Sequence, residues 1–174
     1  DWSSDVCSSD LALFAQAQDT MILSCLQNVM GEIYADDPEN PKSAMAVLGV
    51  FCFFAGEVNA ELIAYKPDTY TIPFILMSAD TSSLRAAIQA QYGERAKKVT
   101  RYAIKKEAGI FSEQRLQQIV DTLGAEYELN LIDEAIFNWS RRQDWCREWT
   151  SLYKDYETYR TTGLGRSEEH TSEL

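Results

Sequence analysis

A nearly continuous apolar run from Ala44 to Gly56 constrains the fold more than any other feature of the sequence. A run of this length predicts one long or two short buried strands, bent at Gly49 and ended at Gly56. The segment 36–41, dense in Asp, Asn and Pro, precedes the run and predicts a turn. Because buried strands need other elements to cover them, the sequence predicts a sheet packed with helices.

The remaining elements follow from side-chain periodicity and from residues that cap helices. Helices are predicted at 20–29 after Asp19, at 59–65, from Thr81 or Ser82 to Tyr92, at 112–123, and in one amphipathic region from Asp133 onward. Further strands are predicted at 32–35, 70–78, 98–107 and 127–131. Together they predict an α/β (α+β) fold with a mixed β-sheet and packed helices, without repeats.

Composition excludes several classes of protein. The chain has 174 residues and a formal net charge of −11, so its surface repels nucleic-acid phosphates. No apolar run approaches the roughly 18 residues of a membrane span. The sparse cysteines, without any Cys-x-x-Cys pair, fit a reducing compartment, and we expect a cytoplasmic protein that contacts neither nucleic acid nor membrane.

Both ends of the chain depart from the pattern of a natural domain. Residues 166–174 can be encoded by a DNA segment whose opposite strand, read one base out of frame, encodes Ser3 to Asp10. We interpret 1–11 and 166–174 as translated sequencing adapters that are disordered, and 12–165 as a single α/β domain. A pair of genuine polar tails is the alternative. Removing both tails takes away six acids and one arginine, which leaves a net charge of −6.

The trimmed body also lacks the usual catalytic side chain. The only histidine of the full chain, His170, lies in the C-terminal tail. The body therefore offers no histidine as general base, triad member or metal ligand, and we predict no metal site. No catalytic residue can be assigned from the sequence.

The segment Arg160-Thr161-Thr162-Gly163-Leu164-Gly165 fits the pattern R/Q-x-x-G-x-G/A, a loop whose backbone N–H groups bind the pyrophosphate of acetyl-CoA. Such a loop follows a strand and precedes a helix. Here an aromatic amphipathic region precedes it. We therefore interpret Arg160, Gly163 and Gly165 as a helix end with a glycine stop and predict that they bind no cofactor.

Two surface features each allow two interpretations. A basic cluster could bind an anionic ligand or form a solvated face; it comprises Arg95, Lys97, Lys98, Arg101, Lys105 and Lys106. An aromatic stripe could line a ligand pocket or pack on a core or partner domain; it comprises Trp145, Trp149, Leu152, Tyr156 and Tyr159.

Three stretches together resemble one family: 23–32, 40–57 and 100–107. They are similar to the N-terminal region of bacterial GNAT-like N-acetyltransferases, in which a leading α/β domain precedes a C-terminal GNAT domain that binds acetyl-CoA. The resemblance covers nearly all of residues 19–165.

This resemblance implies that the chain is the N-terminal part of an enzyme that transfers an acetyl group from acetyl-CoA to a small amine. It implies that the acetyl-CoA-binding half lies beyond Gly165, that the chain alone binds no cofactor, and that the missing GNAT domain packs on Trp145, Trp149 and Tyr156. A stand-alone binding or regulatory module without catalysis is the alternative.

Overall fold

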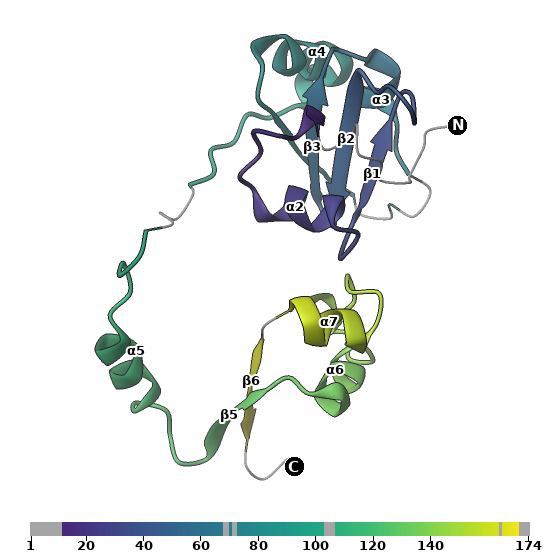
Figure 1. Ribbon diagram of the computed structural model, residues 1–174. Helices are drawn as coiled ribbons and strands as arrows, with labels where there is room; N and C mark the ends of the chain where they lie inside the picture. Colours follow the sequence, from purple (N-terminus) through teal and green to yellow (C-terminus); the bar gives the residue numbers. More distant parts are fainter. Residues whose placement is uncertain (1–11, 68–69, 71–72, 103–106, 164, 171–174) are drawn as a thin grey trace.

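The computed structural model describes residues 12–67, 70, 73–102, 107–163 and 165–170. Figure 1 shows two groups of elements, one built around a larger sheet and one around a two-stranded sheet, with the helix α5 (Glu113–Val120) on the segment between them. The prediction of a single domain over 12–165 stays a prediction. The mixed α+β architecture agrees with the predicted fold class.

The larger sheet contains four strands in the order β1-β2-β3-β4. They are β1 (Glu32–Ala35), β2 (Ser43–Leu48), β3 (Phe51–Gly56) and β4 (Leu76–Ala79). The first three are antiparallel, and β4 pairs in parallel with β3, with Phe51 opposite Leu76 and Phe54 opposite Ala79. The apolar run thus forms two strands, as one of the two sequence alternatives predicts, with the bend at Gly49.

Side chains alternate between the two faces along β2 and β3, and apolar residues lie on both faces. Helices therefore cover both faces of this sheet. Ala46 and Phe53 pack on the face covered by α2 (Thr20–Leu26), together with Cys25. Met45 and Phe54 pack on the opposite face, which α3 (Ala60–Ala64) and α4 (Ser82–Tyr92) cover. The helices begin where capping residues predict: the side chains of Asp19, Asn59 and Thr81 each accept a backbone N–H bond.

Gly31 lies where α2 packs closely against the sheet. Its φ is +77°, and a Cβ there would lie 2.4 Å from the carbonyl oxygen of Val47 and 2.6 Å from Sγ of Cys25. Only glycine tolerates both the left-handed backbone and this contact. Gly31 is therefore a packing requirement as well as a residue with a special backbone conformation.

The second group of elements contains β5 (Tyr127–Leu131), α6 (Glu134–Ser140), the 3₁₀ helix η2 (Arg147–Trp149), α7 (Tyr156–Thr162) and β6 (Arg166–His170). Strands β5 and β6 pair antiparallel. Phe137 on α6 is 1% exposed and contacts the rings of Tyr156 and Tyr159, with centroid distances of 5.6 and 5.3 Å. This aromatic contact packs α6 against α7.

Two predicted strands differ in the structure. Of the strand predicted at 70–78, residues 76–78 lie in β4, and 71 and 72 lie outside the described residues. Pro73, which has no N–H to donate to a ladder, precedes β4. The strand predicted at 98–107 is irregular over 98–102, and 103–106 lie outside the described residues. Val99 and Tyr102 are three residues apart, so they cannot share one face of a strand, and both are exposed.

The C-terminal predictions also need correction. The single amphipathic helical region breaks into α6, η2 and α7, because Asp155 caps a new helix by accepting a bond from the N–H of Thr158. The expectation that 166–174 is disordered is wrong for Arg166–His170, which form β6. The free backbone groups of β5 can pair with any extended segment, whatever its side chains.

None of the helices in the described part of the chain combines the length and the hydrophobicity that crossing a bilayer requires.

Candidate functional site

A cavity of about 800 Å³ lies at the β4 edge of the larger sheet. Strands β3 and β4, helix α4 and the segment that follows α4 line it. Its lining includes Phe51, Phe53, Leu76, Ile88, Tyr92, Arg85, Arg95, Lys97, Lys98 and Arg101. The cavity therefore combines an apolar surface with most of the basic cluster.

The apolar floor follows directly from strand geometry. Phe51 and Phe53 are two residues apart on β3, so they lie on the same face, with ring centroids 6.4 Å apart. Leu76 lies opposite Phe51 in the parallel register. Helix α4 adds Ile88, which packs on the opposite face of the sheet at the same edge. Each of these positions is set by the sheet and its covering helix rather than by a loop.

Tyr92 closes one end of the cavity at the C-terminus of α4. Its hydroxyl donates a hydrogen bond of 2.8 Å to the carbonyl oxygen of Ile63, which ties α4 to α3. Burial raises the pKa of this phenol above its ordinary value, against a smaller opposing effect of the Arg95 charge. Tyr92 is therefore a neutral hydrogen-bond donor at physiological pH.

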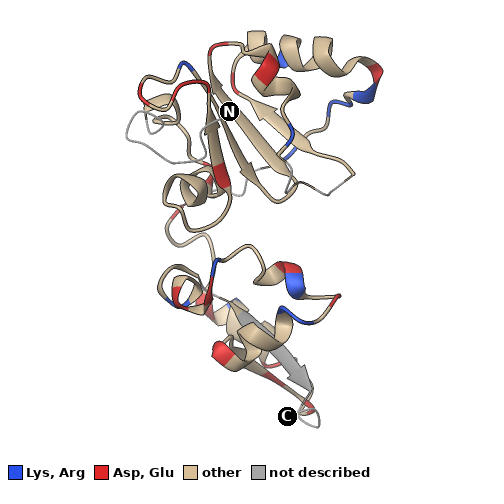
Figure 2. Ribbon diagram, turned by 90° about the vertical axis from the view of Figure 1, so that its right-hand side faces the viewer, with Lys and Arg blue, Asp and Glu red and all other residues tan. Residues whose placement is uncertain are grey.

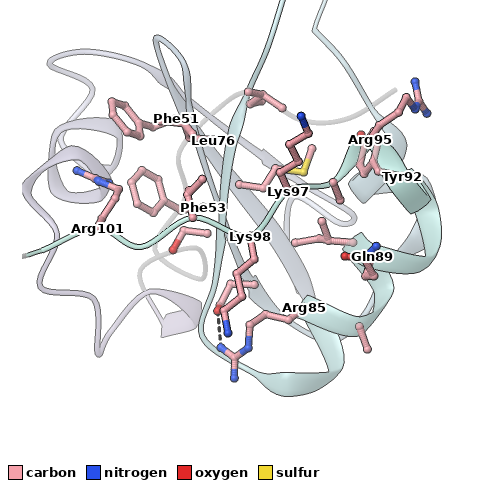
Figure 3. A pocket seen from close by; sticks show the side chains of 18 of the residues that line it. Phe51, Phe53, Leu76, Arg85, Gln89, Tyr92, Arg95, Lys97, Lys98 and Arg101 are labelled. Atoms are coloured by element: carbon pink, nitrogen blue, oxygen red, sulfur yellow. Dashed lines mark hydrogen bonds between the residues drawn. The ribbon is translucent and has the colours of Figure 1, made fainter.

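Two guanidinium groups of the cavity lie over aromatic rings. Cζ of Arg101 is 4.5 Å from the ring centroid of Phe51, and Cζ of Arg95 is 5.5 Å from that of Tyr92. Figure 3 shows the two arginines at different ends of the cavity, with Lys97 and Lys98 between them on the segment after α4. Ring contacts of this kind orient a guanidinium without using its N–H groups.

These four cations, Arg95, Lys97, Lys98 and Arg101, have no carboxylate within ion-pair distance among the described residues. In Figure 2 the ribbon of the segment that leaves α4 carries blue Lys and Arg positions. Asp19 also lines the cavity, but its carboxylate caps α2 through the N–H of Met21 at 2.9 Å. The structure thus brings together four of the six residues of the basic cluster, and Lys105 and Lys106 lie outside the described residues.

Arg85 is a lining residue that the sequence does not single out. Its Nη1 donates to the carbonyl oxygens of Ala79 and Asp80 at 2.7 and 3.0 Å, which fixes the end of β4. Its position one turn after the Thr81 cap is the available signal, since that turn faces the end of β4. Phe51 and Leu76 were also missed as site residues, because the sequence predicts them only as sheet core.

The motif 160–165 has a different geometry from that of a phosphate loop. Thr161 and Thr162 are the last residues of α7, and the N–H of Gly163 donates to the carbonyl oxygen of Tyr159 at 2.7 Å. The guanidinium of Arg160 pairs with Glu157 in the same helix, at 2.9 Å from Nε. The Gly163 N–H and the Arg160 side chain are therefore already used within the helix.

The space beside the two glycines is also filled. A Cβ on Gly163 would lie 2.6 Å from a ring carbon of Tyr159, and one on Gly165 would lie 2.7 Å from the Tyr159 hydroxyl. The described residues of the motif therefore do not fit the pyrophosphate of acetyl-CoA. The assignment of Arg160, Gly163 and Gly165 as non-binding stays a prediction for a binding measurement.

The aromatic stripe divides into two parts. Trp145 and Trp149 are 69% and 59% exposed and contact each other edge to face, with a centroid distance of 5.5 Å. Trp139 contacts Trp145 at 6.0 Å, and we call these three residues the tryptophan cluster. Tyr159 is buried and Tyr156 is half-buried, both on Phe137. The stripe is thus part core and part surface.

The described residues provide neither a metal site nor a reactive thiol. Within the described ranges, no group of three or more His, Cys, Asp or Glu side chains is arranged to hold a metal. Cys25, Cys52 and Cys146 are buried. Burial raises the pKa of Cys25 to about 11 and that of Cys52 further, so neither is a thiolate at neutral pH.

Comparison with known proteins gives the family. The chain matches the family model described as GNAT acetyltransferase over residues 11–174. The chain belongs to the GNAT acetyltransferase family.

One solved relative of this GNAT-family chain is a GCN5-related N-acetyltransferase-like protein from Streptococcus suis, known from a crystal structure. The two are 31% identical with a TM-score of 0.75, and the similarity covers 92% of this chain and 64% of that one. The GNAT-family chain thus spans slightly less than two thirds of the length of its relative. It matches no protein in the curated set.

Proposed function

We propose that this GNAT-family chain is the N-terminal part of an acetyl-CoA-dependent N-acetyltransferase whose acceptor is a small amine. The family match over 11–174 carries the proposal. The geometry at Gly163 and Gly165 supports the further point that the acetyl-CoA-binding half lies beyond this chain, because those residues leave no cradle for a pyrophosphate. In this proposal, 1–11 and 166–174 are adapter-derived and the parent is a bacterial, cytoplasmic enzyme of two domains.

The first test is the source DNA. Amplification and sequencing outward from the codons for Leu13 and Leu164 should give a reading frame that continues past Gly165 into a strand, an R/Q-x-x-G-x-G/A loop and a helix. The extended protein should release coenzyme A from acetyl-CoA in the presence of an amine, measured with a thiol reagent. A stop codon directly after Gly165 would overturn the enzyme proposal in favour of a stand-alone binding module.

The second test is calorimetry of acetyl-CoA with the present chain. We expect no saturable binding at the motif 160–165, because the Gly163 N–H and the space beside its glycines are already used. Arg160→Ala is the probe, because the motif accepts arginine or glutamine at this position but not alanine, and among the described residues this exposed side chain is hydrogen-bonded only to Glu157. Saturable binding that Arg160→Ala abolishes would restore the motif as an acetyl-CoA site.

We also propose that the remainder of the parent enzyme covers Trp145 and Trp149. The length of the Streptococcus suis relative leaves room for such a remainder, and two exposed tryptophans in contact form an apolar surface of the kind that marks interfaces. Tyr156 contributes less, because Phe137 and Tyr159 already cover part of it.

A hydrophobic dye tests this surface. The chain should bind the dye or self-associate, and Trp145→Gln with Trp149→Gln should lower both effects. Phe111→Gln is the control, since Phe111 is equally exposed at 64% but lies outside the tryptophan cluster. A clean monomer without dye binding would contradict the missing-domain proposal.

A further inference from the structure

The cavity at the β4 edge is not explained by acetyl transfer. It lies in the first group of elements, whereas the motif 160–165 and the tryptophan cluster lie in the second. Acetyl-CoA also carries phosphates and a ring, so the two sites are told apart by their residues: binding at the motif depends on Arg160, and binding at this cavity depends on Arg95 and Arg101.

The charge of the cavity contrasts with the charge of the chain. The protein carries a net charge of −11, yet Arg95, Lys97, Lys98 and Arg101 line one cavity without a carboxylate partner among the described residues. Cations that line the same cavity repel one another and raise the local concentration of anions. An anionic ligand offsets that repulsion.

The two arginines are arranged to bind a particular kind of anion. Phe51 and Tyr92 hold the guanidinium groups of Arg101 and Arg95 by their faces, so the N–H edges remain available. The planar fork of a guanidinium matches two oxygens of a phosphate, and holding it in advance lowers the entropy lost on binding. Lys97 and Lys98 add point charges between the two forks.

The volume of the cavity and its apolar floor indicate what else the ligand contains besides anionic groups. A cavity of about 800 Å³ lies within the range of small-molecule sites, roughly 300–1,000 Å³, and exceeds what a single phosphate fills. Phe51 and Leu76, paired across β3 and β4, provide an apolar surface next to Arg101. A single carboxylate would leave most of the positive charge uncompensated, whereas several phosphates would balance it.

We propose that the cavity between β4, α4 and residues 95–102 binds a small molecule that carries several phosphate groups and an apolar ring, with the phosphates on Arg95, Lys97, Lys98 and Arg101 and the ring on the Phe51–Leu76 floor. Nucleotides have this chemistry. An acidic peptide lying along the free edge of β4 is the competing occupant, and the test separates the two.

Calorimetry on the full 174-residue chain tests the site with tripolyphosphate, ATP, adenosine and a hexaglutamate peptide as probes. Tripolyphosphate should bind saturably with one site, and ATP should bind more tightly because its ring covers the apolar floor. Adenosine alone should bind much more weakly than ATP, since it lacks the anion. Added salt should weaken tripolyphosphate binding.

A pair of charge variants identifies the residues. Arg95→Gln combined with Arg101→Gln should weaken ATP binding about tenfold or more, because charge-assisted hydrogen bonds to two forks are lost. Arg115→Gln combined with Arg142→Gln is the matched control, with the same change of charge at exposed arginines outside the cavity. The control should bind ATP as the unmodified chain does. All four arginines are exposed, and circular dichroism checks that both variants fold.

Three results would overturn the proposal. One is the absence of saturable binding for both tripolyphosphate and ATP. Another is equal weakening by the two double variants, which would show a general charge effect without a site. The third is hexaglutamate binding that needs Arg95 and Arg101 while ATP does not bind, which would assign the cavity to an acidic protein segment.

Discussion

A buried pair of hydroxyl groups joins α6 to the turn after η2, and its removal gives a sharp test of the structure. Oγ of Ser140 and Oγ1 of Thr150 are 2.7 Å apart, and the two residues are 3% and 0% exposed. Ser140 Oγ also contacts the carbonyl oxygen of Phe137 at 2.9 Å. This pair positions the segment that carries Trp145 and Trp149.

The two single substitutions should differ in cost. Thr150→Val keeps the shape and removes one hydroxyl, while Ser140 can still donate to Phe137, so we expect a loss of about 1 kcal/mol in the free energy of unfolding. Ser140→Ala leaves the Thr150 hydroxyl buried without this partner, and we expect about 1–3 kcal/mol. The double variant should cost about 1 kcal/mol less than the sum, because the second change removes a group already unpaired.

Urea unfolding followed by tryptophan fluorescence measures these free energies, since Trp139, Trp145 and Trp149 report on this part of the molecule. Thr122→Val is the control: its hydroxyl bonds to the carbonyl oxygen of Ile119 at an exposed site, and we expect a change within about 0.5 kcal/mol. Strict additivity of Ser140→Ala and Thr150→Val would refute the direct contact and with it the placement of the turn after η2.

Two further predictions concern the first group of elements. Gly56→Ala should destabilise the chain by at least about 1 kcal/mol more than Gly109→Ala. Both glycines have a positive φ, but only a Cβ at Gly56 would clash with a neighbouring atom, the carbonyl oxygen of Lys42 at 2.0 Å. Chemical denaturation compares the two, and equal losses would refute the contact. The free energy of unfolding should stay level from pH 7 to about pH 8.5 and fall above it. In the unfolded chain Cys25 and Cys52 ionise near the ordinary thiol pKa, about 8.5. In the folded chain burial raises the pKa of Cys25 to about 11 and that of Cys52 further, so alkaline pH favours the unfolded chain. Denaturation at pH 7 to 10 measures this, and a Cys25→Ala, Cys52→Ala variant with an unchanged alkaline slope would contradict it.

The sequence alone determined the helices and strands that are specified by residues next to them in the chain. The caps at Asp19, Thr81, Ser112 and Asp133 each start a helix where predicted, because a side-chain oxygen satisfies N–H groups only a few residues away. The apolar run forms two buried strands for a similar reason, since Gly49 and Gly56 permit backbone conformations with positive φ that other residues rarely adopt.

The predictions that were wrong concern residues whose conformation or burial depends on contacts with distant parts of the sequence. Trp145 and Tyr159 look alike on one helical stripe, yet one is exposed and the other buried, because the chain breaks at the Asp155 cap and only α7 returns to Phe137. The segment 98–102 carries strand-forming residues but is irregular, since its apolar side chains do not share a face.

The candidate site shows the same division. Lysines and arginines close together in the sequence identify a basic cluster, but not whether it is a solvated face or part of a cavity. Only the tertiary structure places Arg101 over Phe51 and Arg95 over Tyr92, residues from a strand and a helix that a short irregular segment brings to one sheet edge. Local sequence sets which charges exist, whereas the pairing of β3 with β4 and the packing of α4 decide what those charges face.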